Sequence, residues 1–124
     1  MKTPTLVIGA STKEHRYSNK AIRKLRASQV ETFAIGATKG SVLDVSIETE
    51  KKEYLNIHTV AMYLNPALQE AYYNYVLGLQ PKRVIFNPGT ENKEFIELLK
   101  EQGIEVDLAC TLVLLATGQY EERA

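Results

Sequence analysis

The stretch that most constrains the fold lies at residues 5–12, where an apolar run breaks into a turn of small residues. Thr5-Leu6-Val7-Ile8 is short, apolar and β-prone, and Gly9-Ala10-Ser11-Thr12 follows it directly. A turn of this composition lets backbone amides approach a phosphate group. A helical pattern follows at residues 19–27. A buried strand, a tight glycine turn and a helix form the opening unit of a doubly wound α/β domain.

The rest of the chain repeats this alternation. The apolar patterns predict further strands at residues 30–35, 57–64, 83–87 and 104–107, and helices at 66–79 and 91–102. Residues 37–56 are expected to form a loop with at most a short edge strand, and residues 109–115 fit either a short helix or a strand. We therefore predict an α/β fold: a Rossmann-like, doubly wound parallel sheet of about five strands in the order 3-2-1-4-5, with helices on both faces.

Composition limits the size and the surroundings of this fold. A chain of 124 residues with 44% hydrophobic residues can bury one core, so residues 1–124 are expected to form a single domain. Fifteen basic and fifteen acidic residues cancel, which leaves no overall field to attract nucleic acid or an anionic membrane. One cysteine, no signal-peptide core and no apolar run of membrane-spanning length predict a cytoplasmic protein.

Turn-forming clusters follow four of the five predicted strands. They are Gly9-Ala10-Ser11, Gly36-Ala37-Thr38, Asn65-Pro66 and Asn87-Pro88-Gly89-Thr90. Ligands of such sheets bind beyond the carboxyl ends of the strands, where the strand order reverses. In the order 3-2-1-4-5 the first and fourth clusters would flank that point, and free helix amides would make it an anion site. Taken singly, each cluster is also what any strand-to-helix connection needs for backbone reasons.

The absence of two common nucleotide-binding motifs limits which nucleotide the chain is expected to bind. The opening turn lacks the full G-x-G-x-x-G pattern, and no acidic residue follows the second strand to hold a ribose. Gly36 to Lys39 stand there instead, and a lysine suits an extra phosphate better than a free ribose edge. NAD is therefore disfavoured. No G-x-x-x-x-G-K-[ST] loop is present, which counts against an ATP-hydrolysing P-loop protein.

Three motifs of the chain are Val7-Ile8-Gly9-Ala10-Ser11, Arg16-Tyr17-Ser18 and Phe86-Asn87-Pro88-Gly89-Thr90-Glu91. Together they resemble the motifs of the small stand-alone coenzyme A-binding domains, which are similar in fold to the nucleotide-binding domain of the succinyl-CoA synthetase α subunit. The resemblance implies that the first motif wraps the phosphates, that the second adds side-chain contacts, and that Asn65-Pro66 with Pro88-Gly89 border the rest of the ligand. The candidate binding residues are Gly9, Ala10, Ser11, Thr12, Arg16, Tyr17, Ser18, Gly36, Lys39, Asn65, Pro66, Asn87, Pro88, Gly89 and Thr90.

The function expected from these features is binding of coenzyme A or an acyl-CoA, a small-molecule ligand, without catalysis. The first alternative is an acyl- or phosphoryl-transfer enzyme of the same fold, for which Ser11, His15, Glu91 and Cys110 are the candidate base and nucleophile residues. The second is an interaction protein with a vestigial crevice. We assign no catalytic residue and, because two isolated histidines and one cysteine lack ligand spacing, no metal site. Tyr73 is expected outside the core, where it could contact a second copy in a homodimer.

Overall fold

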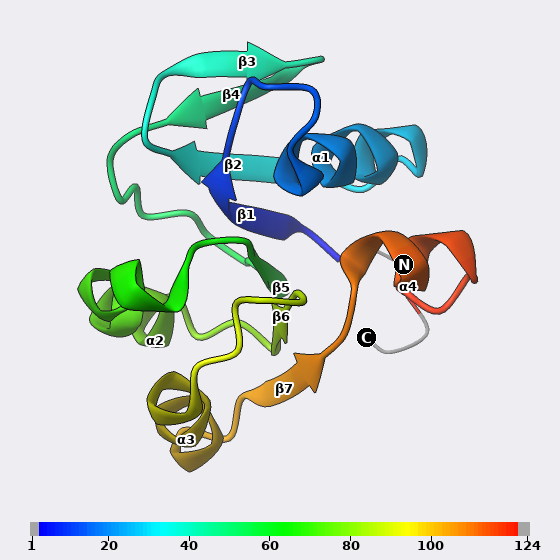
Figure 1. The fold of residues 1–124 in the computed structure, drawn as a ribbon. Helices are drawn as coiled ribbons and strands as arrows, with labels where there is room; N and C mark the ends of the chain where they lie inside the picture. The colour runs from blue at the N-terminus through cyan, green and yellow to red at the C-terminus, as the bar shows by residue number, and fades with distance from the viewer. Residues whose placement is uncertain (1–2, 122–124) are drawn as a thin grey trace.

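The computed structural model describes residues 3–121 and contains one seven-stranded sheet in the order β3-β4-β2-β1-β5-β6-β7. Neighbouring strands are parallel except for β3, which runs antiparallel to β4. Helices α1 and α4 cover one face of the sheet, and α2 and α3 cover the other (Figure 1). The elements are β1 (Thr5–Ala10), α1 (Tyr17–Ala27), β2 (Thr32–Gly36), β3 (Gly40–Val42), β4 (Val45–Glu48), β5 (Thr59–Met62), the 3₁₀ turns η1 (Pro66–Leu68) and η2 (Glu70–Tyr72), α2 (Tyr73–Leu79), β6 (Arg83–Phe86), α3 (Lys93–Glu101), β7 (Glu105–Leu108) and α4 (Thr111–Ala116).

The expected α/β architecture, a mostly parallel sheet with helices on both faces, is confirmed, but the five-strand order 3-2-1-4-5 is wrong. The third predicted strand, β5, pairs directly with β1, with Thr5 opposite Thr59 and Val7 opposite Ala61. The five predicted strands therefore follow the order 2-1-3-4-5. A right-handed crossover is compatible with either order, so the local sequence pattern did not decide between them. The order reverses between β1 and β5, which places the expected ligand crevice there.

The remaining two strands come from residues 37–56, for which the sequence pattern predicts a loop with at most a short edge strand. Strands β3 and β4 form a hairpin, and β4 extends the sheet by pairing in parallel with β2. Val42, Val45 and Ile47 are buried, whereas Ser41 and Ser46 face outward. This alternation spans only a few residues on either side of the turn, too few for a clear strand pattern.

Residues 66–79, expected as one helix, form the two 3₁₀ turns and the shorter helix α2. Asn65 caps the first turn, because its Oδ1 accepts a hydrogen bond of 2.8 Å from the amide of Ala67. Gln69 is fully buried, and its Nε2 donates to the carbonyl oxygens of Leu64 at 2.8 Å and Thr90 at 2.9 Å. This glutamine joins the turns to the segment that precedes α3. The ambiguous segment at 109–115 contains helix α4.

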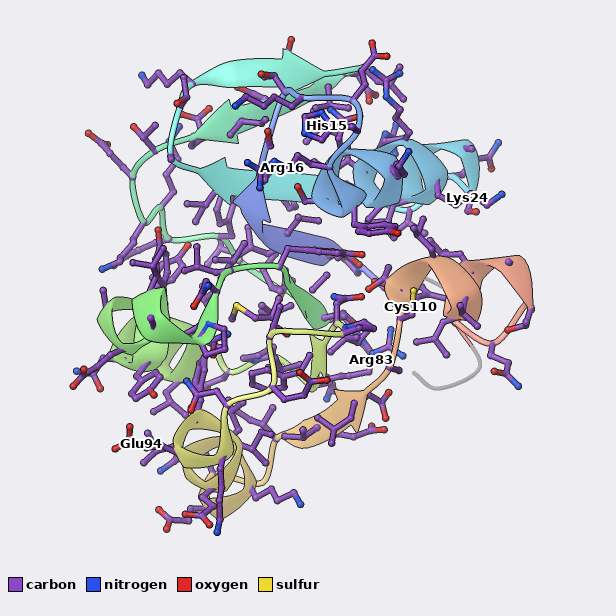
Figure 2. All side chains as sticks on the ribbon, viewed as in Figure 1. His15, Arg16, Lys24, Arg83, Glu94 and Cys110 are labelled. Atoms are coloured by element: carbon purple, nitrogen blue, oxygen red, sulfur yellow. The ribbon has the colours of Figure 1, made fainter. Side chains whose placement is uncertain are left out.

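A buried polar cluster holds the two ends of the described chain together at the amino edge of the sheet. Arg83, labelled in Figure 2, is fully buried and donates to Thr59 Oγ1 and to the Tyr120 carbonyl, both at 3.1 Å. Its guanidinium also lies 4.6 Å from the centre of the Tyr120 ring. The Tyr120 hydroxyl is hydrogen-bonded to Thr5 Oγ1, and Thr3 Oγ1 donates to Glu121 Oε2 at 3.1 Å. Residues 3–5 and 120–121 are thereby fixed side by side.

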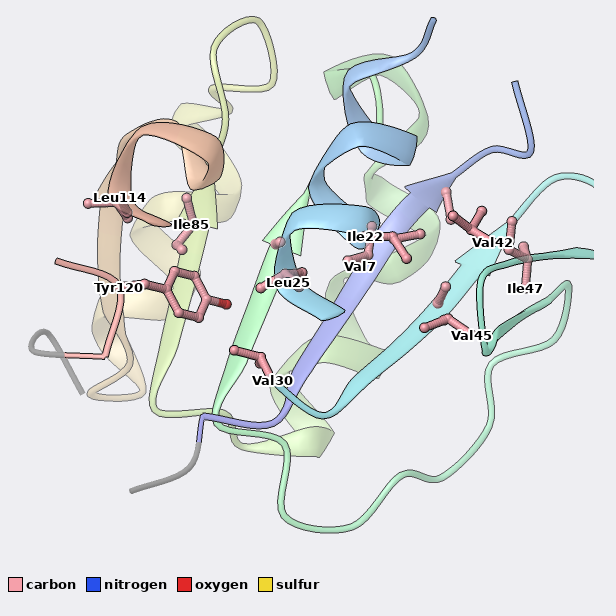
Figure 3. Close-up of a cluster of buried hydrophobic side chains, with 13 residues drawn as sticks. Val7, Ile22, Leu25, Val30, Val42, Val45, Ile47, Ile85, Leu114 and Tyr120 are labelled. Carbon is pink, nitrogen blue, oxygen red and sulfur yellow. The ribbon is translucent and has the colours of Figure 1, made fainter. Parts of the chain in front are cut away.

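Each face of the sheet has its own hydrophobic cluster, as expected for parallel strands covered on both sides. Strand β1 alternates between them, because Val7 belongs to one cluster and Leu6 and Ile8 to the other. The cluster under α1 and α4 includes Ile22 and Leu114 (Figure 3). Because both faces of β1 are buried, its carboxyl end is held rigidly at the position where the crevice opens.

Candidate functional site

A cavity of about 470 Å³ opens at the carboxyl ends of β1, β5 and β6. We call it the crevice. It lies where the strand order reverses, the place at which sheets of this kind bind ligands. Its lining residues are Gly9, Ser11, Arg16, Tyr17, Ser18, Tyr63, Asn87, Pro88, Thr90, Cys110 and Leu112.

Gly9 lines one wall of the crevice, at a position where a residue with a β-carbon would not fit. The register of β1 against β2 shifts between Ile8 and Ala10, which is a β-bulge, and Gly9 within it has a φ of 97°. A β-carbon at Gly9 would lie 2.8 Å from the amide nitrogen of Leu64 and 2.8 Å from the carbonyl carbon of Tyr63. The backbone of β1 therefore passes directly against the chain that leaves β5, and the bulge leaves main-chain surface open to a ligand.

The segment between β1 and α1 is fixed by backbone and side-chain hydrogen bonds. Asn19 of α1 donates from Nδ2 to the Ser11 carbonyl at 2.9 Å, and Ser11 Oγ accepts from the Lys13 amide at 3.0 Å. Helix α1 begins at Tyr17, and no side chain caps it. Amides of a first helical turn lack intrahelical partners and carry the positive end of the helix dipole. Because Arg16 to Ser18 line the crevice, this positive end borders it.

Asn87 shapes the opposite wall. Its side chain is buried, with Nδ2 donating to the Met62 carbonyl at 3.0 Å and Oδ1 accepting from the Thr111 amide at 2.8 Å. Its carbonyl oxygen accepts from Thr90 Oγ1 at 2.7 Å. One asparagine therefore ties together the end of β5, the turn after β6 and the start of α4. Both polar atoms of the Asn87 side chain are hydrogen-bonded to the protein backbone, so Asn87 supports the wall of the crevice.

Three lining residues, Tyr63, Cys110 and Leu112, are absent from the predicted binding residues. The Tyr63 hydroxyl is buried and has no hydrogen-bond partner among the described residues. Burial raises the pKa of the Tyr63 phenol well above its ordinary value, and the neighbouring Thr111 hydroxyl opposes that shift only in part. Cys110 is half-buried at the start of α4 (Figure 2). Tyr63 and Cys110 each follow the carboxyl end of a strand within two positions, and this was the sequence signal available for them.

The other predicted binding residues lie outside the crevice lining, and several have local structural roles. They are Ala10, Thr12, Gly36, Lys39, Asn65, Pro66 and Gly89. Gly36 allows close approach, since a β-carbon there would lie 2.2 Å from the Ala10 carbonyl oxygen. The Gly89 amide donates to Glu91 Oε1 at 2.9 Å, within the turn that leads to α3.

Two physical properties of the described chain bear on metals and membranes. Within residues 3–121, no three His, Cys, Asp or Glu side chains come together in a way that could hold a metal ion. None of the helices in the same range has the length and apolarity needed to cross a bilayer.

The mostly parallel sheet, its two helical layers and the crevice at the point of strand reversal define a Rossmann-like α/β domain. Comparison with known families identifies it further: the chain belongs to the CoA-binding domain family, whose model matches residues 3–116. This family was expected from the three motifs and is confirmed.

Solved structures share the fold of this chain. A crystal structure of an uncharacterized protein is 43% identical, with a TM-score of 0.94 and coverage of 97% of this chain and 99% of that one. A Thermus thermophilus structure is 21% identical, with a TM-score of 0.80, and covers 95% of this chain and 91% of its own. A hypothetical protein from Pyrococcus horikoshii OT3 is 20% identical, with a TM-score of 0.80 and coverage of 98% of this chain and 83% of that one. The last two show the fold alone. No curated protein matches the chain.

Proposed function

We propose that this protein binds coenzyme A or an acyl-CoA in the crevice and does not transform it. Membership of the CoA-binding family supports CoA binding in general. The observation that carries the proposal for this crevice is the meeting of two backbone features in one cavity: the bulge at Gly9 and the uncapped first turn of α1. Both present main-chain groups, and the helix adds a positive dipole, as phosphate sites require.

The phosphates of CoA are assigned to the side of the crevice formed by Gly9, Ser11 and the amides of Tyr17 and Ser18. Arg16 lies at the same helix end, is exposed and lines the crevice. A guanidinium can donate two parallel hydrogen bonds to a phosphate, so Arg16 is proposed to clamp the pyrophosphate from the solvent side.

The more apolar side of the crevice is assigned to the pantetheine arm. Tyr63, Pro88 and Leu112 line it, together with the half-buried Cys110. A cavity of about 470 Å³ falls within the usual range for small-molecule sites, about 300–1,000 Å³. An elongated ligand would fill it with one part and leave the rest at the surface.

Binding without catalysis is proposed because, within residues 3–121, no hydrogen bond joins a candidate nucleophile, Ser11 or Cys110, to a candidate base, His15 or Glu91. Ser11 Oγ accepts from the Lys13 amide, and the Glu91 carboxylate accepts from the Gly89 amide. General base catalysis needs a base within hydrogen-bond reach of its nucleophile. His15, exposed in the loop before α1, is assigned no such role.

Thermal denaturation and calorimetric titration with CoA, acetyl-CoA, NAD, NADP and ATP test this proposal. We expect CoA to stabilise the protein by about 2.7 kcal/mol at a concentration of about 100 Kd, and NAD to stabilise it far less. Arg16→Ala should weaken CoA binding roughly tenfold through loss of a charge-assisted hydrogen bond, whereas Lys100→Ala on α3 should leave it unchanged.

Two results would contradict the proposal. Absence of stabilisation by CoA at millimolar concentration would exclude CoA as the ligand of the crevice. Conversion of acetyl-CoA during incubation, followed by chromatography, would favour the acyl-transfer alternative over simple binding.

A further inference from the structure

Six cations lie on residues 13–26, between the crevice and the far end of α1. We call this set, Lys13, Arg16, Lys20, Arg23, Lys24 and Arg26, the basic strip. Only one acidic residue, Glu14, interrupts it, although the whole chain has no net charge. Figure 2 shows Arg16 and Lys24 at the two ends of α1. The overall neutrality of the protein therefore hides a strongly positive local surface.

Most of this charge has no partner in the protein. Arg26 pairs with Asp44 at 2.8 Å, and Arg23 lies 3.7 Å from Glu14. Within residues 3–121, no ion pair is recorded for the other four members of the strip, all of which are exposed. These four positive charges are available to a ligand in solution.

Helix stability accounts for only part of the strip. Cations in the last turn of a helix are favoured by its dipole, and this applies to Lys24 and Arg26. The same dipole disfavours cations at the start of a helix. Arg16 nevertheless stands at the N-cap, and no acidic residue occurs in the first turn. The positive charge beside the crevice mouth is therefore not explained by the stability of α1.

We propose that the basic strip captures the polyanionic ligand electrostatically and guides it into the crevice. This inference rests on the proposed binding of CoA, and it goes further by assigning a function to residues outside the crevice lining, Lys20 and Lys24. A surface of one sign next to a binding site raises the local concentration of an oppositely charged ligand and speeds association by ~10- to 1,000-fold.

The geometry of α1 predicts how far each lysine acts. With a rise of about 1.5 Å per residue, Lys20 lies roughly 6 Å and Lys24 roughly 12 Å along the helix from Arg16. The Debye length is about 30 Å in 0.01 M salt and about 8 Å in 0.15 M salt. Lys20 should therefore contribute at both salt concentrations, and Lys24 mainly at the lower one.

Ligand charge provides a second signature. CoA carries a 3′-phosphate in addition to its pyrophosphate, whereas dephospho-CoA carries the pyrophosphate alone. If the strip acts through long-range attraction, its effect on association should be larger for CoA than for dephospho-CoA. The strip would then favour ligands with the additional phosphate.

Stopped-flow measurement of association with CoA, followed through intrinsic tyrosine fluorescence, tests this inference. The variants are Lys20→Glu and Lys24→Glu, with Lys100→Glu as the control. Lys24 and Lys100 are a matched pair, because each is an exposed lysine in the last turn of its helix, and α1 and α3 lie on opposite faces of the sheet. Lys24→Glu and Lys100→Glu should therefore lower the thermal stability by similar amounts, and they change the net charge of the protein equally.

In about 10 mM salt we expect the association rate to fall about three- to tenfold in Lys20→Glu and by a smaller factor in Lys24→Glu, with little change in Lys100→Glu. Dissociation rates should stay within about twofold of the wild type, and the differences should disappear in about 0.5 M salt. The loss should be smaller with dephospho-CoA.

Equal slowing by Lys100→Glu would show that net charge, and not the strip, controls association, and would overturn the inference. So would an effect confined to dissociation or one independent of salt. In each of these cases CoA still binds, and the proposed function stands. A wild-type protein that fails to bind CoA at all would overturn both.

Discussion

Replacement of Asn87 by alanine should destabilise the whole protein, because this side chain connects three segments around the crevice. The substitution removes the hydrogen bonds from Nδ2 to the Met62 carbonyl and from the Thr111 amide to Oδ1, at 3.0 and 2.8 Å. A hydrogen bond contributes about 1 kcal/mol net, and a buried group left without its partner costs about 1–3 kcal/mol. We expect the free energy of unfolding to fall by about 2–5 kcal/mol, measured by urea denaturation.

The near-isosteric variant Asn87→Asp separates hydrogen bonding from packing. It keeps an acceptor for the Thr111 amide but places a second oxygen against the Met62 carbonyl oxygen. Burial and this unfavourable contact raise the pKa of the introduced carboxyl in the folded state. The folded state then binds its proton more tightly than the unfolded state, so the destabilisation should grow as pH rises from about 5 to about 8.

Asn65→Ala is the control for both variants. Asn65 is exposed and provides one capping hydrogen bond, to the Ala67 amide, so its loss should cost about 0.5–2 kcal/mol without pH dependence. A loss below about 0.5 kcal/mol in Asn87→Ala would refute the bridging role assigned to Asn87. A pH-independent loss in Asn87→Asp would refute the electrostatic argument.

Other variants test the backbone and the tyrosines. Gly9→Ala should cost more than about 2 kcal/mol in urea denaturation, because a positive φ disfavours alanine and its β-carbon would meet the Leu64 amide. Tyr63→Phe removes a buried hydroxyl that has no hydrogen-bond partner within residues 3–121, so it should raise the free energy of unfolding by about 1 kcal/mol at neutral pH. Tyr120→Phe loses its bond to Thr5 and should cost about 1 kcal/mol. Because burial raises the pKa of Tyr63, stability should fall as pH rises through the alkaline range, and Tyr63→Phe should lessen that fall. Alkaline behaviour identical to the wild type would contradict this account.

The elements were largely predictable because their signals are local. Apolar runs ending in turn residues located the five strands, and the helical patterns located α1 and α3. The order of the strands was not predictable in the same way, since pairing between β1 and β5 depends on contacts across the sheet. The β3–β4 hairpin was missed because its alternating pattern is short and charged residues follow it.

In the candidate site, too, the local features were predictable and those that depend on packing between elements were not. The turns after β1 and β6 meet at the crevice even though the predicted strand order is wrong, since β5 alone separates these strands. Tyr63 and Cys110 were harder to assign, because nothing in their residue types distinguishes a lining residue from a core residue. Their placement depends on how β5 and α4 pack around Asn87.

The hydrogen bonds that join residues 3–5 to residues 120–121 have a practical consequence for work with this protein. These residues meet at the amino edge of the sheet, whereas the crevice opens at the carboxyl edge. A short peptide linker could therefore connect residue 3 to residue 121 with little strain, and the chain could be opened in the exposed loop around residue 51. Such a circularly permuted chain would keep the entrance to the crevice unobstructed, and so would a reporter domain joined next to residue 3 or residue 121.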